Sequence, residues 1–201
     1  MLQSRLRPGK KGIRALGIAE SFRKDVGGRS ILAGVVQRAD LLIDGVVMGS
    51  CTVGGMDATD AIIRMWTELD RDDVNVILLS GCVISWFNIV ELPRLHQQIS
   101  TPIISLTYEE SEGLTEVIKR RFPEDWMERN RIYIANGERT PITVKTGLRI
   151  YVRALGMDIK TCEEIVNRFL IQGRYPEPVR VAKIVARSAL NLLNDGRLGD
   201  F

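Results

Sequence analysis

The sequence predicts an α/β fold with a mixed sheet of about five strands, helices on both faces of the sheet and further helices at the C-terminus. Short apolar runs bounded by polar turns are typical of buried strands. After residue 57, the apolar residues recur at the spacing of a helix. Strands and helices go on to alternate, and a strand, helix, strand order requires a crossover that leaves the two strands parallel.

The N-terminal part predicts three strands in succession. Residues 13–19, IRALGIA, are almost continuously apolar and are followed by a polar stretch with two adjacent glycines, so they predict a strand buried on both faces and then a turn. Residues 30–38 and 45–53 repeat the short β-branched pattern. Three such strands in a row predict an antiparallel meander.

The middle of the chain predicts a helix, a strand, a helix and a strand. An amphipathic helix is expected after Asp57, because apolar residues recur there at helical spacing. Residues 74–81 then predict a second buried strand, and residues 102–108 predict another. The helix between them is expected at 90–98, with Asn88 in position to cap it.

The C-terminal part predicts mostly helices. One helix is expected to end in residues 117–122, and residues 131–136, RIYIAN, predict a strand. A further strand is expected either near 142–146 or at 149–155. Two amphipathic helices follow, separated by prolines. Their apolar faces comprise Cys162, Ile165, Val166, Phe169 and Leu170 in the first, and Ala182, Ala186, Ala189, Leu190 and Leu193 in the second.

Composition favours one compact domain over residues 1–201. The chain is 45% hydrophobic, enough for a sizeable core, and its net charge of +3 permits binding to a polyanion without requiring it. Three widely separated cysteines lack the spacing of a zinc site or a disulfide framework. Without a signal-peptide core or a membrane span, a cytoplasmic location and no membrane partner are expected. Composition does not indicate the oligomeric state.

Four stretches, in order, carry a resemblance to a known family: LGIAES, GGMDATDAIIRM, VILLSGCVISWFNIVELPRL with TPIISLT after it, and YPEPVRVAKIVARSAL. Together they resemble domain-of-unknown-function family 99, of the UPF0215 type, a mainly archaeal set of relatives of endonuclease V. The resemblance covers nearly the whole chain. It implies a ribonuclease H-like fold, whose element order agrees with the one above, and a role with nucleic acid as partner.

The resemblance also implies where a catalytic metal would bind. Endonuclease V uses magnesium, and matching its motifs puts the ligand positions at Ala19 or Glu20, near Asp57, at Ser80 and near Lys183. Members of the family typically carry an acidic pair at the first position, an acid at the third and a histidine at the last. This chain therefore retains Glu20 and Asp57 as candidate catalytic residues and as candidate ligands for Mg²⁺ or Mn²⁺.

Each of these candidates also has a purely structural interpretation. Glu20 fits a polar turn residue at the end of a strand, and Asp57 fits the N-cap of the helix that follows it. Lys183 would repel a divalent ion and attract a phosphate, or it would simply lie solvated on its helix.

Three further residues are candidates for binding nucleic acid. Trp86 and Phe87, in the loop after the strand at 74–81, would stack on unpaired bases if exposed, and the alternative is that they pack in the core. Arg180, in the first turn of the last helix, is available to a carboxylate or a phosphate.

Three functions follow from these patterns. The leading hypothesis is an endonuclease V-related protein that binds nucleic acid with a centre too poor in carboxylates for two-metal cleavage. The second is an active endonuclease dependent on Mg²⁺ or Mn²⁺, in which Glu20 and Asp57 suffice with one ion. The third is a non-catalytic interaction protein whose cleft is closed.

Overall fold

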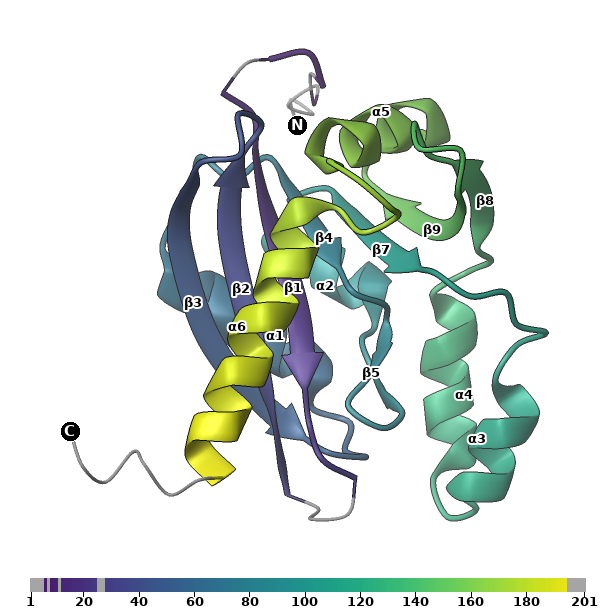
Figure 1. The fold of residues 1–201 in the computed structure, drawn as a ribbon. Helices are drawn as coiled ribbons and strands as arrows, with labels where there is room; N and C mark the ends of the chain where they lie inside the picture. The colour runs from purple at the N-terminus through teal and green to yellow at the C-terminus, as the bar shows by residue number, and fades with distance from the viewer. Residues whose placement is uncertain (1–5, 7, 11, 25–27, 195–201) are drawn as a thin grey trace.

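A seven-stranded mixed sheet forms the centre of the computed structural model, which describes residues 6, 8–10, 12–24 and 28–194 (Figure 1). The strand order is β3-β2-β1-β4-β7-β9-β8. The predicted α/β class is confirmed, but the expected number of about five strands was too low. The strands are β1 (Arg14–Ser21), β2 (Arg29–Arg38), β3 (Ile43–Thr52), β4 (Val76–Leu79), β7 (Ile103–Thr107), β8 (Thr140–Thr143) and β9 (Arg149–Leu155).

The predicted meander and crossovers are both present. Strand β1 pairs antiparallel with β2, which pairs antiparallel with β3, while β1 pairs parallel with β4 and β4 parallel with β7. The carboxyl ends of β1, β4 and β7 therefore meet at one edge of the sheet. In open α/β sheets, this is the edge where ligands bind.

Helices cover both faces of the sheet, as the sequence predicted. On one face, α1 (Ala58–Leu69) and α2 (Leu92–Ile99) pack on β1 to β4 through a common apolar cluster. On the other face, α5 (Ile159–Phe169) packs on β8 and β9, and α6 (Glu177–Asn194) crosses β1 and β2 (Figure 1).

The start of α6 lies directly against β1 because Gly17 has no side chain. A Cβ atom at Gly17 would come within 2.2 Å of the carbonyl carbon of Pro178, so no larger residue fits without moving the helix. This close approach brings the next turn of α6, which carries Lys183, over the carboxyl end of β1.

The predictions for residues 131–155 need two corrections. Residues 131–135 continue α4 (Trp126–Ala135), which packs beside α3 (Thr115–Arg121), and they form no strand. The buried residues of α4 are Arg129 and Ile132, so its inner face is partly polar and the apolar period of the helix is weak. The two strands proposed as alternatives, β8 and β9, both form and pair with each other.

The three cysteines are buried and free. Among the described residues, no helix combines the length and the apolar character needed to cross a membrane.

Candidate functional site

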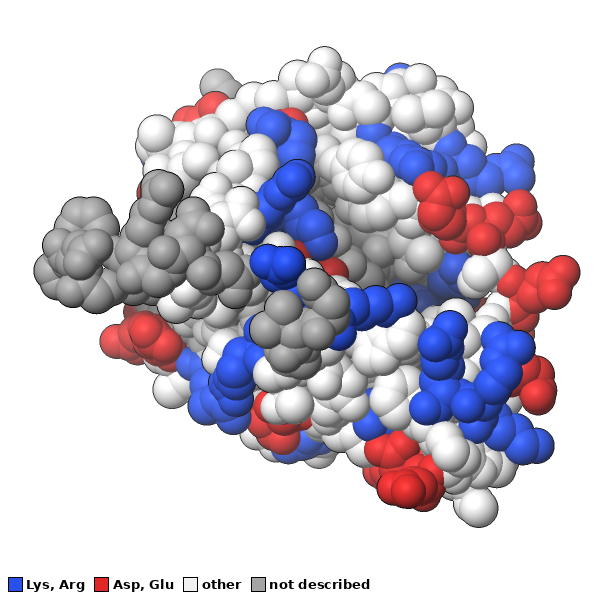
Figure 2. Space-filling model, turned by 60° about the horizontal axis from the view of Figure 1, so that its bottom comes forward, with Lys and Arg blue, Asp and Glu red and all other residues white. Residues whose placement is uncertain are grey.

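A pocket of about 520 Å³ opens where β1, β4 and β7 end. Its wall includes residues from each of these strand ends, from a short hairpin after β4, from α4 and from β9. Lys and Arg side chains gather on both sides of a hollow on this face of the molecule (Figure 2). A mostly apolar pocket with basic side chains around it is suited to a ligand that carries both a ring and a negative charge.

The alternation of β1 decides which of its last residues faces the pocket. Ala19 is buried under α6, where it contacts Val35 and Ala182, whereas Glu20 lines the pocket. The position next to Glu20 is therefore occupied by a small apolar residue that belongs to the core. Within the first strand, only Glu20 is placed to act in the pocket.

Glu20 and Lys183, which are 163 residues apart in the chain, meet at the rim of this pocket. The Lys183 Nζ atom donates to the backbone carbonyl of Glu20 at 2.7 Å and lies 3.3 Å from its Oε1 atom. The Lys183 side chain is half exposed, as the interpretation of a solvated lysine expects, and its ammonium group also has a carboxylate partner.

Burial raises the pKa of Glu20, and the charge of Lys183 only partly opposes this effect. The Oε2 atom is buried and has no hydrogen-bond partner among the described residues. Glu20 is thus a carboxylate whose environment satisfies one of its two oxygens.

Asp57 lies in a different environment. It precedes α1, but its side chain makes no capping bond to that helix. Its Oδ1 atom accepts from the Thr52 backbone N–H at 2.9 Å and from Asn88 Nδ2 at 2.7 Å, and its Oδ2 atom accepts from Thr52 Oγ1 at 2.9 Å. Burial alone would raise the pKa of Asp57, but these hydrogen bonds outweigh it and lower the pKa.

The capping role expected for Asp57 belongs to Asn88 instead. The Oδ1 atom of Asn88 accepts from the Ala58 backbone N–H at 2.9 Å, while its amide nitrogen donates to Asp57 and to the Thr52 carbonyl. The prediction that Asn88 caps the helix at 90–98 was wrong, because Glu91 occupies the N-cap position of α2. Asp57 is absent from the residues that line the pocket, so Glu20 and Asp57 do not share this wall.

Trp86 and Phe87 form the tip of a tight hairpin between β5 (Val83–Ile84) and β6 (Asn88–Ile89). Both lie in the left-handed backbone region, with φ of 62° and 61°. Residues other than glycine rarely adopt this conformation. Phe87 packs toward α3, with its ring centroid 5.7 Å from that of Phe122. Phe87 is partly buried and also lines the pocket, so its role with nucleic acid stays a prediction.

Trp86 is flanked by two cations from other parts of the chain. The Lys24 Nζ atom lies 3.4 Å from the centroid of the indole ring, and the guanidinium carbon of Arg121 lies 5.2 Å from it. Cation–π contacts of this kind hold charged groups beside an aromatic face. The hairpin tip thus presents an aromatic ring and two positive charges together.

Arg129 fixes the hairpin in place. Its side chain is buried, pairs with Asp125 at 2.7 Å, and donates to the carbonyls of Gly54, Gly55 and Phe87 at 2.8 to 2.9 Å. One guanidinium from α4 therefore joins the loop after β3 to the hairpin after β4. Such a buried and fully hydrogen-bonded arginine restricts the movement of both loops.

Arg180 lies one turn before Lys183 on α6 and is exposed. Its guanidinium is paired with Glu177, with Nη2 at 2.6 Å from Oε2, and it is not among the residues that line the pocket. Its role with nucleic acid stays a prediction.

The sequence interpretation missed the inner wall of the pocket. Tyr108, Tyr133, Arg139 and Arg153 contribute to it from β7, α4 and β9 or from segments beside them. An arginine at position 153, inside the apolar run RIYVRAL, was a usable signal, because charged residues are rarely buried unless they are paired.

As a ligand set for a divalent metal, this pocket fits poorly. Its carboxylates are Glu20 and Glu109, each beside a cation: Lys183 at 3.3 Å and Arg174 at 2.6 Å. Ser80 offers only a neutral hydroxyl. Throughout the described part of the chain, no three His, Cys, Asp or Glu side chains converge as metal ligands would.

The comparisons with known proteins agree with the geometry at the level of family and fold. Residues 11–190 match the family model described as endonuclease dU. The chain belongs to the endonuclease dU family. A UPF0215 protein of Pyrobaculum calidifontis is 35% identical over 179 residues, which cover 89% of this chain and 98% of that protein.

Two solved structures are similar in fold to this endonuclease dU family member. The crystal structure of a protein of unknown function from Archaeoglobus fulgidus is 27% identical, with a TM-score of 0.77, and the match covers 88% of this chain and 98% of that one. Endonuclease V of Ciona intestinalis, in complex with inosine-containing DNA, is 17% identical with a TM-score of 0.60, covering 91% and 88%. The predicted family and the ribonuclease H-like fold are thereby confirmed.

Proposed function

We propose that this endonuclease dU family member binds single-stranded or locally unpaired nucleic acid across the pocket, and that the site does not support two-metal hydrolysis. The observation that carries the proposal is the contact between Lys183 and Glu20. At the end of β1, where a divalent ion would need negative charge, the carboxylate is already beside an ammonium group. A fixed cation at this position repels Mg²⁺ and attracts a phosphate directly.

The hairpin supports the same proposal. Trp86 supplies an aromatic face on which an unpaired base can stack, and Lys24 and Arg121 supply positive charges within reach of the backbone phosphates on either side. Proteins that bind single strands without strict sequence preference combine these two features. Binding of DNA by a structural relative, endonuclease V of Ciona intestinalis, agrees with this use of the fold.

The second candidate is an active endonuclease, and the family description, endonuclease dU, favours it. In this alternative Glu20 and Asp57 would hold a single Mg²⁺ or Mn²⁺ ion. Two features support this alternative. The lowered pKa of Asp57 favours its ionised form, and the Oε2 atom of Glu20 makes no hydrogen bond to a described residue. The third candidate, an interaction protein with a closed cleft, predicts no salt-dependent affinity for nucleic acid.

The test measures both binding and cleavage with the full chain. Fluorescence anisotropy with labelled single-stranded DNA and RNA should give an affinity that falls with salt. Trp86→Ala should weaken it by about tenfold, since stacking on one base is worth about 1–3 kcal/mol. Lys183→Met should weaken it by about tenfold as well, because a charge-assisted hydrogen bond to a phosphate is lost. Lys160→Met, which removes an exposed lysine on α5, is the matched control and should leave the affinity unchanged.

In the cleavage arm, DNA and RNA containing deoxyuridine, uridine or inosine are incubated with the protein in Mg²⁺ and in Mn²⁺. We expect no robust cleavage. Robust cleavage that disappears in both Glu20→Gln and Asp57→Asn would replace our proposal with the active endonuclease. If the affinity for nucleic acid changes neither with salt nor in Trp86→Ala and Lys183→Met, the interaction protein would be favoured instead.

A further inference from the structure

Arg153 carries a buried guanidinium that pairs with no carboxylate of the described residues. Its side chain lies in β9 and is 7% exposed. The Nε atom donates to the Gly137 carbonyl at 2.8 Å and Nη1 donates to Cys82 Sγ at 3.4 Å, while Nη2 has no hydrogen bond to any described residue. These acceptors and the Tyr133 ring, whose centroid lies 5.6 Å from the guanidinium carbon, are all neutral partners, so no negative charge offsets the charge of Arg153.

Arg139 lies beside it and is also bound only to neutral acceptors. Its Nη1 atom donates to the Glu109 carbonyl at 3.3 Å, and its Nη2 atom donates to the carbonyl and hydroxyl of Ser111 at 2.7 and 3.0 Å. Neither Arg139 nor Arg153 forms an ion pair with a carboxylate in the described part of the chain. The Glu109 carboxylate is instead paired with Arg174.

This state contrasts with that of Arg129, the other buried arginine among the described residues. Arg129 is paired with the Asp125 carboxylate at 2.7 Å through two hydrogen bonds. Burying an ion without a counter-ion costs free energy unless a partner of opposite charge binds. Two neighbouring guanidinium groups at the wall of a pocket thus form a place for an external anion.

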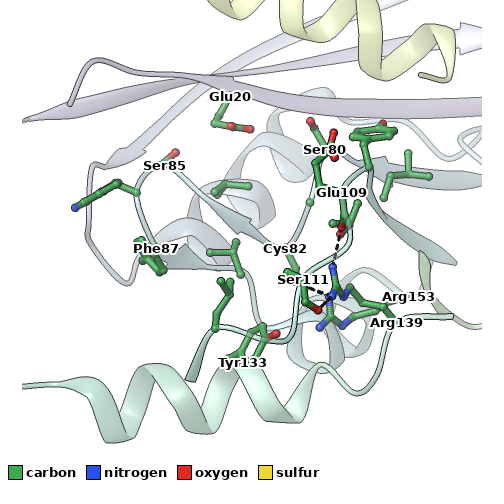
Figure 3. Close-up of a pocket in the computed structure, with 18 of the residues that line it drawn as sticks. Glu20, Ser80, Cys82, Ser85, Phe87, Glu109, Ser111, Tyr133, Arg139 and Arg153 are labelled. Atoms are coloured by element: carbon green, nitrogen blue, oxygen red, sulfur yellow. Dashed lines mark hydrogen bonds between the residues drawn. The ribbon is translucent and has the colours of Figure 1, made fainter. Parts of the chain in front are cut away.

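The geometry of the pocket indicates what else the ligand carries. Arg139 and Arg153 lie together on the side opposite Glu20 (Figure 3). Aromatic rings contribute to the wall, and the hydroxyl of Tyr108, which lines the pocket, is buried without a hydrogen-bond partner among the described residues. A volume of about 520 Å³ is within the range for a small-molecule ligand. The rings contributed by the wall are those of Phe22, Trp86, Phe87, Tyr108, Tyr133 and Tyr175.

We infer that this pocket binds the phosphate monoester of a nucleotide, with the phosphate on Arg139 and Arg153 and the base against the aromatic wall. A monoester carries more negative charge than a phosphodiester and three terminal oxygens, which two guanidinium forks can bind together.

The inference goes beyond the proposed function, because it requires no strand in the cleft. The same chemistry is offered by a free nucleoside monophosphate and by the phosphorylated terminal nucleotide of a strand. In both cases the two arginines would recognise the monoester, and the experiment separates these two sources.

The test is calorimetric titration of the full chain with uridine monophosphate, adenosine monophosphate, uridine and inorganic phosphate. We expect saturable binding of the monophosphates and at least about tenfold weaker binding of uridine. Arg139→Met should weaken monophosphate binding by about 10- to 100-fold, since a hydrogen bond to a charged group is lost. Arg149→Met, an exposed arginine on the same strand as Arg153, is the matched control and should have no effect.

The second arm compares single strands with and without a terminal phosphate. If the ligand is a strand end, the phosphorylated strand binds more tightly in the parent protein and this advantage disappears in Arg139→Met. If it is a free nucleotide, monophosphates bind while the terminal phosphate gives no advantage. Arg153→Lys keeps the buried positive charge, so it should disturb folding less than a neutral substitution at this position. It should still reduce the affinity for monophosphates, because the guanidinium fork is lost.

The inference is overturned if uridine and its monophosphate bind equally, if neither monophosphate binds, or if Arg149→Met weakens binding as much as Arg139→Met. These outcomes leave the proposed function intact whenever an unphosphorylated strand still binds and still responds to Trp86→Ala. Loss of strand binding with retained monophosphate binding would instead reject the proposed function alone.

Discussion

Glu20 and Asp57 are two carboxylates near the ends of strands in the same meander, and they have opposite environments. Asp57 accepts hydrogen bonds from Thr52 and Asn88 on both of its oxygens, and its pKa is lowered. Glu20 has one oxygen near Lys183 and one that is buried with no hydrogen-bond partner in the described part of the chain, and its pKa is raised. One carboxylate is therefore fully used by the fold, whereas the other retains capacity for a ligand or a proton.

The difference teaches that the presence of an acid in a family motif does not decide its role. What decides it is whether the surrounding chain has already satisfied the oxygens. Asp57 joins the end of β3 to the hairpin that contains Asn88, so its ionised form stabilises the structure. Glu20 is destabilised by burial when it is ionised, which is more typical of a site than of a structural residue.

The largest effect expected from this comparison is on stability. Asp57→Ala removes the hydrogen bonds from Thr52 and Asn88, so we expect a loss of about 1–3 kcal/mol in the free energy of unfolding, measured in urea. Asp60→Ala, which removes an exposed acid on the same helix, is the control and should cost no more than about 0.5 kcal/mol. Equal losses in the two variants would show that Asp57 is not a structural residue.

A smaller effect is expected at the other carboxylate. Lys183→Met and Glu20→Gln, combined in a double-mutant cycle, should give a coupling free energy of about 0.5–1 kcal/mol, because Lys183 is half exposed and water screens the pair. Glu20→Gln alone should be close to neutral, since it removes a charge that burial disfavours. A coupling of zero would mean that the two side chains do not interact in solution.

The smallest effect is on the pH dependence of stability. Since the pKa of Glu20 is raised above its ordinary 4.5 in the folded state, folding favours the protonated form, and this contribution is full below pH 4.5 and lost as pH rises through the folded pKa. The pH dependence due to Asp57 has the opposite sign. Its contribution to the free energy of unfolding is lost as pH falls through the folded pKa, which lies below 3.8.

Chemical unfolding at a series of pH values measures this difference. Relative to Glu20→Gln, the parent protein should gain stability on acidification from neutral pH toward pH 4.5. Identical profiles for the two proteins would contradict the buried environment assigned to Glu20.

Much of the fold follows from local patterns in the sequence. The meander of β1 to β3, the alternation of α1, β4, α2 and β7, and the apolar faces of α5 and α6 are all set by the spacing of apolar residues within short segments. Such patterns fail at α4, because its buried face includes Arg129, whose partners are a carboxylate and three backbone carbonyls. A polar residue that is buried by hydrogen bonding gives no apolar signal.

By itself, the sequence determined the family, the fold class and the identity of the two residues that form the pair, a glutamate at the end of a strand and a lysine on the last helix. Only the tertiary structure decided which of these residues meet. Glu20 contacts a lysine 163 positions away, and Asp57 contacts an asparagine 31 positions away. The physical reason is that the charge state and free capacity of a side chain depend on neighbours that the folded chain brings from distant segments, whereas strand and helix patterns depend on neighbours in sequence.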